Sequence, residues 1–162
     1  MDVTILLAQL VATGAIAAWL STGLRDNLLH PALNETYTAE VFSMARMQSE
    51  YPEAFDMVAH RAITKRRTQK IAFRAVVAVE ALACILLWVG VVALLMAIAG
   101  TAGAETARVL ALLGATAFTA VWAGFLVVGN YFYYWFCHEG AQNTHYQMTL
   151  WGLGTMILIS LP

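Results

Sequence analysis

The main feature of this chain of 162 residues is a set of long apolar runs that contain few charged side chains. The first occupies positions 3–24, between Asp2 and Arg25, and contains no charged side chain. A bilayer core about 30 Å thick requires roughly 20 predominantly apolar helical residues, because each residue advances a helix by about 1.5 Å. Runs of this length therefore predict helices that cross a membrane.

Four stretches reach this length, at about 3–24, 71–99, 106–136 and 144–161. Charged residues make up only 12% of the chain, against about 25% in soluble domains. Strands of a membrane barrel would alternate over about ten residues, whereas these runs are continuous. We predict an all-α polytopic membrane protein whose single domain, 1–162, is a bundle of four transmembrane helices. A net charge of −1 argues against a nucleic-acid partner.

The polar connection 25–70 separates the first two predicted spans. The pattern over 38–47 favours a helix with Val41 and Met44 on one face, and Pro52 suits the start of a second short helix. We expect these interfacial helices to pack on the bundle rather than to dock a partner. A basic cluster is expected to contact lipid headgroups, namely Arg61, Lys65, Arg66, Arg67, Lys70 and Arg74. By the charge rule this connection is cytoplasmic and both termini lie outside.

Glu80 lies near the middle of the second predicted span, where a charged carboxylate costs roughly 2.5–3.5 kcal/mol. The favoured interpretation is a structural carboxyl group, protonated or hydrogen-bonded, that ties helices together through a contact with the third span. Its expected partners are Thr116, Thr119 and the intramembrane Asn130. The alternative is a role in proton relay or ligand contact.

Cofactor candidates gather near the end of the third span. His138 and His145 frame the connection that follows, and Tyr134 and Trp135 belong to the aromatic run 131–136. An interfacial aromatic belt and ordinary interfacial histidines are the favoured interpretation, and haem, quinone or pigment binding is the alternative. No ligand spacing indicates a metal site. The pairs Gly14/Ala18 and Ala120/Gly124 predict close packing, within the bundle or with another subunit.

Three stretches resemble a bacterial family of predicted small integral membrane proteins, known as a domain of unknown function. They are His60-Arg61-Ala62-Ile63 followed by Glu80-Ala81-Leu82, the block Val128-Gly129-Asn130-Tyr131-Phe132 through Trp135, and the ending Ile157-Leu158-Ile159-Ser160-Leu161-Pro162. The resemblance implies four spanning helices, a long first connection and no established activity. Relatives tend to have Gly-Glu-Trp at positions 129–131 and basic residues in the second connection, which implies the opposite orientation.

No nucleophile, phosphate-binding loop, dinucleotide fingerprint or zinc-protease motif occurs in the sequence, so we expect no enzyme activity. The leading expectation is a non-catalytic accessory subunit of a larger membrane complex, in the cytoplasmic membrane of a bacterium, with bound lipid and no cofactor. The first alternative is a small proton-coupled transporter or homo-oligomeric carrier that uses Glu80. The second is a protein that binds haem, a quinone or a pigment.

Overall fold

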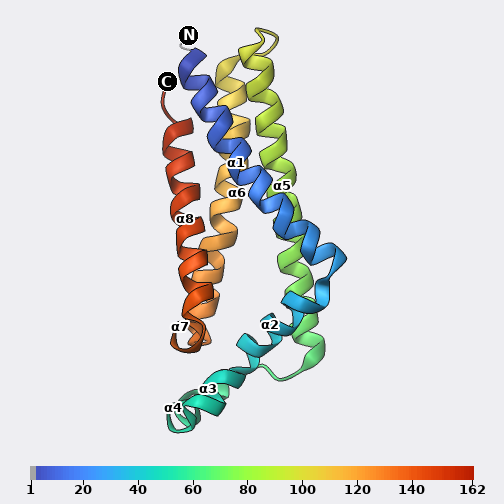
Figure 1. Ribbon diagram of the computed structural model, residues 1–162, viewed down its shortest axis with the longest axis vertical. Helices are drawn as coiled ribbons and strands as arrows, with labels where there is room; N and C mark the ends of the chain where they lie inside the picture. Colours follow the sequence, from blue (N-terminus) through green and yellow to red (C-terminus); the bar gives the residue numbers. More distant parts are fainter. Residues whose placement is uncertain (1–2) are drawn as a thin grey trace.

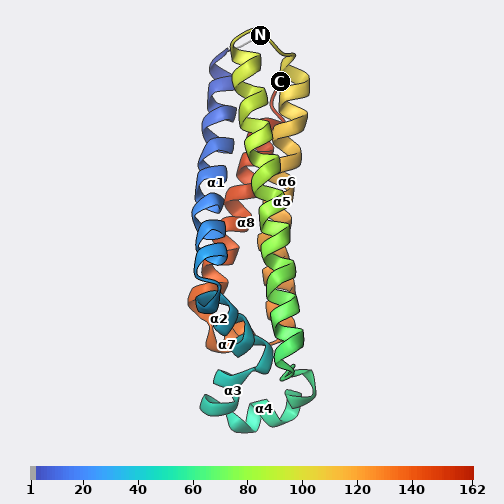
Figure 2. The same ribbon diagram turned by 90° about the vertical axis from the view of Figure 1, so that its right-hand side faces the viewer.

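Four long helices form the body of the molecule in a computed structural model that describes residues 3–162. They are α1 (Val3–Leu29), α5 (Arg66–Ile98), α6 (Ala104–Tyr131) and α8 (Glu139–Ile159). Between them lie α2 (Pro31–Ser43), α3 (Ala45–Glu50), α4 (Pro52–Val58), the 3₁₀ turn Ala59–Arg61 and α7 (Tyr134–Cys137). Figure 1 shows α1 and α6 running in one direction and α5 and α8 in the other, with both chain ends at one end of the bundle. The short helices α3 and α4 lie at the opposite end, which Figure 2 shows from the side.

The helical fold class is confirmed, because the described residues form helices and no strand. Three of the long helices, α1, α5 and α6, are long and apolar enough to cross a membrane. The fourth, α8, falls outside that group because polar side chains crowd its first half, including Gln142, Asn143 and Gln147. The predicted count of four crossings is therefore not confirmed by length and composition.

The observed helices extend beyond the predicted spans. Helix α1 continues past Arg25 to Leu29, and α5 begins at Arg66 rather than near position 71. Helix α8 begins at Glu139, so only His138 separates it from α7. The predicted bounds were placed where charged residues interrupt the apolar sequence. A helix ends instead where a residue disrupts its backbone hydrogen bonds. Here Pro31, which has no backbone N–H to donate, follows the break at His30.

The contact between α5 and α6 is built on glycine. A Cβ atom added to Gly90 would lie 2.5 Å from Cα of Ala111, and one added to Gly114 would lie 2.8 Å from the backbone of Leu87. By contrast, nothing lies within 4 Å of a Cβ added to Gly14 or Gly124. The predicted small-residue pairs at those two positions therefore make no close contact inside the bundle. Spacing alone did not identify the face that is packed.

Gln9 joins α1 to the end of α8. Its side chain is fully buried, and Nε2 donates to the carbonyl oxygens of Leu158 (3.1 Å), Ile159 (3.3 Å) and Leu161 (3.1 Å). Arg108 Nε donates in turn to Gln9 Oε1 at 3.2 Å. The last carbonyl groups of a helix have no partner within it, so this clamp satisfies them and attaches α8 to α1.

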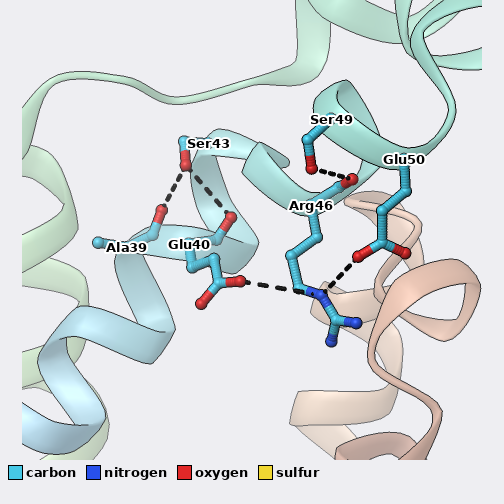
Figure 3. A network of polar contacts seen from close by, with 6 residues as sticks. All are labelled: Ala39, Glu40, Ser43, Arg46, Ser49 and Glu50. Atoms are coloured by element: carbon cyan, nitrogen blue, oxygen red, sulfur yellow. Dashed lines mark hydrogen bonds and ion pairs between the residues drawn. The ribbon is translucent and has the colours of Figure 1, made fainter.

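The polar connection folds into short helices, as predicted, but with a break that the sequence pattern did not reveal. Met44 has φ 53°, so the helix expected over 38–47 is divided into α2 and α3. Around this corner, Arg46 Nε contacts the carboxylates of Glu50 (3.1 Å) and Glu40 (4.0 Å), and Ser43 Oγ donates to carbonyl oxygens of α2 (Figure 3). The second short helix does begin at Pro52.

The apolar face of this connection packs on the protein itself, as expected. Met44 and Met47 are buried against Phe132 and Cys137, which follow α6. This second apolar cluster is separate from the main core between the long helices. It holds the short helices beneath the end of α6, close to the aromatic run.

Gly90→Ala is expected to lower the thermal unfolding midpoint in detergent, because the new methyl group must push α5 away from α6 over a rigid backbone contact. The destabilisation should be about 1–3 kcal/mol. Gly154→Ala is the matched control, since nothing lies within 4 Å of its added Cβ. An unfolding midpoint of Gly90→Ala equal to that of the control would contradict this packing.

Candidate functional site

A cavity of about 310 Å³ lies inside the half of the bundle that α2 covers. Its walls come from the second half of α1, from α2, from the first half of α5 and from the last turns of α6, together with Tyr134 and His145. Figure 1 shows α1 running away from α8 and toward α5 along its length, and residues of its second half line the cavity. Helix α2 turns back at His30 and lies over this space.

Glu80 is the acidic residue that lines this cavity, and only 5% of its surface is exposed. Asn27 Nδ2 donates to Glu80 Oε2 at 2.8 Å, and Asn34 Nδ2 donates to Asn27 Oδ1 at 2.6 Å. This chain of hydrogen bonds links α5 to α1 and α1 to α2. The prediction that Glu80 forms a hydrogen bond to another helix is confirmed.

The predicted partners on the third span are wrong. Asn130 is exposed in the last turn of α6, and Thr116 is exposed as well. Thr119 is buried, but its hydroxyl group donates to the carbonyl oxygen of Ala115 at 2.7 Å. Partners for Glu80 were expected on the third span because the sequence pattern assigned Asn27 to the polar connection. The extra turn of α1 places Asn27 beside Glu80 instead.

Two polar groups of the cavity lack a complete set of partners. Glu80 Oε1 accepts no hydrogen bond from any described residue, and none of the ion pairs among residues 3–162 includes Glu80. Trp122 is 7% exposed, and its indole N–H is buried without an acceptor. Buried polar groups are nearly always paired, so the buried Trp122 N–H without an acceptor, together with a Glu80 Oε1 that accepts no hydrogen bond, indicates room for a polar ligand atom.

Tyr134 and His145 close one end of the cavity together. The Tyr134 hydroxyl group and His145 Nδ1 are 3.1 Å apart, and the His145 ring stacks on Phe125 with centroids at 4.7 Å. Tyr133 has φ 53° and ends the helical path of α6, so the aromatic run is not the single helical belt that was predicted. Tyr134 turns inward and is buried, whereas Trp135 remains 40% exposed.

His138 occupies a different environment from His145 and is not among the residues that line the cavity. Its ring meets the Tyr37 ring edge-on with centroids at 5.1 Å, and Nδ1 is buried without a partner. Burial lowers the pKa of His138 and raises the pKa values of Tyr37 and Cys137. The two candidate histidines therefore do not face one cofactor. Across residues 3–162, no group of three His, Cys, Asp or Glu side chains could hold a metal ion.

Part of the predicted headgroup-binding cluster is occupied by internal contacts. Arg61 donates to the carbonyl oxygen of Tyr131 at 3.2 Å and lies over the Tyr131 and Tyr133 rings. Arg66 and Lys70 both approach Glu35, at 2.6 Å and 3.9 Å. The remaining members, Lys65, Arg67 and Arg74, have no ion-pair partner in the described part of the chain. Lipid binding by the cluster remains a prediction.

Most of the cavity lining was missed by sequence reasoning, including its polar members Asn27 and Asn34 and the indole of Trp122. Both asparagines lay in the segment taken as polar connection, and Trp122 was one of many apolar residues of the third span. A signal was present for Asn27: between Leu24 and Pro31 no residue breaks a helix, so the amide could have been placed on an extended first helix.

A family model described as predicted small integral membrane protein, DUF2165, matches residues 5–162. The chain belongs to this family. No curated protein and no solved structure matches it. The DUF2165 assignment agrees with the apolar helices α1, α5 and α6, and it makes the protein an integral membrane protein.

Asn27→Leu should destabilise the DUF2165 protein by about 1–3 kcal/mol, because it leaves the buried Glu80 carboxyl group without its donor. Glu80→Gln is the matched variant: its amide oxygen can accept the same hydrogen bond from Asn27, so its stability should stay near that of the wild type. Thermal unfolding in detergent measures both. Equal losses in the two variants would show that the Asn27 hydrogen bond is not what stabilises this contact.

Proposed function

We propose that this protein crosses the cytoplasmic membrane of a bacterium four times, catalyses no reaction, and holds a small amphipathic molecule in the cavity beside Glu80. The observation that carries this proposal is the pairing of a 310 Å³ cavity with two incompletely paired polar groups, Glu80 Oε1 and the Trp122 N–H. Ligand cavities are typically apolar with a few polar groups that fix orientation.

Helix α8 supplies the fourth crossing in this proposal. Its 21 residues span about 32 Å, close to the thickness of a bilayer core. It packs along α6, its last carbonyl groups are clamped by Gln9, and His145 in its polar half lines the cavity. Polar side chains within a span are tolerated where they line a cavity or pack on protein. Both chain ends lie at one end of the bundle (Figure 1), which supports an even number of crossings.

The carrier hypothesis uses the same cavity and differs only in whether the ligand moves across. The buried Glu80 carboxyl group favours it, since intramembrane acids often mark proton or substrate paths. Haem is less well supported, because only one of the two candidate histidines, His145, lines the cavity. A colourless preparation of the purified protein would exclude haem and most pigments.

Filling the cavity tests ligand binding directly. Gly23 lines the cavity, and nothing lies within 4 Å of a Cβ added to it, so Gly23→Leu should fold and occupy the space. We expect organic extracts of the wild type, purified in mild detergent, to contain a small amphipathic molecule that mass spectrometry no longer finds in extracts of Gly23→Leu. Gly154→Leu, outside the cavity, should retain it. A wild-type extract with only detergent and bulk phospholipid would contradict the proposal.

We further propose that the protein acts as an accessory subunit of a larger membrane complex. The Gly14/Ala18 pair supports this, because it makes no close contact inside the bundle and Ala18 is exposed on α1. A small-residue strip left open on a spanning helix allows a second helix to approach closely.

Gly14→Leu should abolish association with partner subunits, because the larger side chain holds the neighbouring helix away from α1. Mild-detergent purification of a tagged chain, followed by native mass measurement, tests this. The Gly154→Leu variant should still bring the partner down. Recovery of the wild type as a lone monomer would count against the subunit role.

A further inference from the structure

The charge of the cavity is one-sided. Among the described residues, Glu80 is the acidic residue that lines the cavity, and no Lys or Arg side chain lines it. His145 is the nitrogen base in this lining, and its Nδ1 faces the Tyr134 hydroxyl group. An anionic ligand, such as a fatty acid, would bring an acidic group beside the carboxyl group of Glu80 with no Lys or Arg side chain to offset it. The lining therefore disfavours anions.

Aromatic side chains line much of the cavity. Six of the rings are those of Trp19, Phe42, Phe73, Trp122, Phe125 and Phe132. The face of an aromatic ring carries negative charge density, so rings around a site can attract an organic cation as well as apolar groups. An aliphatic cavity would offer only the second attraction.

The hydrogen bonds of Glu80 leave one position open for such a cation. Asn27 Oδ1 accepts from Asn34, which turns the Asn27 amide nitrogen toward Glu80 Oε2. The carboxyl group is thereby held in place, and Oε1 accepts from no described residue. Ionised carboxylates inside a membrane pair with a positive charge where one is present, and the chain supplies none within ion-pair distance across residues 3–162.

We infer that the cavity binds a lipophilic ammonium ion, with its N–H groups donating to Glu80 Oε1 and its apolar body against the aromatic walls. This inference rests on the proposed ligand-binding function and names its ligand class. The volume of about 310 Å³ suits a small arylalkylamine and lies at the lower end of the range for ligand pockets, which begins at roughly 300 Å³.

The test compares two probes of matched shape, 4-phenylbutylamine and 4-phenylbutanol, at neutral pH, where the amine is cationic. Equilibrium dialysis of radiolabelled probe against the full chain in micelles, with protein-free micelles as the blank, gives both affinities. We expect the amine to bind at least about tenfold more tightly than the alcohol, as ion pairing and cation–π attraction together would provide. Glu80→Gln should bring the two affinities together. Glu105→Gln, an exposed acid outside the cavity, should preserve the preference.

The outcomes separate the two proposals. Equal binding of amine and alcohol to the wild type would overturn the ammonium inference and leave the ligand-binding function standing. Binding of neither probe, together with extracts free of any small ligand, would overturn both. An amine preference that persists in Glu80→Gln would show that the ammonium group does not meet Glu80. The wild-type comparison needs no variant, so the inference stays testable if Glu80→Gln fails to fold.

Discussion

A polar group in the interior of a membrane must find its partners within the protein, because lipid chains provide none. In this molecule the constraint applies to Glu80, whose carboxyl group is hydrogen-bonded through the side-chain amides of two residues on two other helices. Asn27 donates to the carboxyl group and Asn34 holds Asn27. The contact fixes α2 against α1 and α5, and so places the helix that covers the cavity. Without the Glu80 carboxyl group, Asn27 would lose its acceptor on α5, and the hydrogen bonds that link α2 to α5 through Asn27 and Asn34 would be broken.

The same chain of amides explains why a cavity persists among tightly packed helices. At the α5–α6 contact, Gly90 and Gly114 allow the backbones to meet, and the core there is closed. Toward the other end, large aromatic side chains lie between the helices, around a carboxyl group that is held by Asn27, which Asn34 holds in turn. Small residues thus close one half of the bundle, while rings and amides keep the other half open.

Much of the architecture could be predicted from the sequence. Apolar runs led to the long helices, and Pro52 marked the start of α4, whereas α2 begins at Pro31, ahead of the helix expected over 38–47. The site was harder to predict, because its geometry depends on backbone features with weak local signals. Met44 and Tyr133 adopt positive φ and redirect the chain, although neither residue type favours that conformation. Asn27 seemed remote from Glu80 because it was assigned to the polar connection rather than to α1. Without the turn at Tyr133, Tyr134 seemed part of a belt at the membrane interface.

The clamp formed by Gln9 also orders the events of assembly. Its acceptors belong to residues 158, 159 and 161, so the start of α1 stays without its final partners until α8 has been synthesised and inserted. The pairing of α1 with α5 can form earlier, since both helices and the amides of α2 precede α6 along the chain. The wall that carries His145 is the last to arrive, and during biogenesis the cavity is open to the surrounding lipid until then.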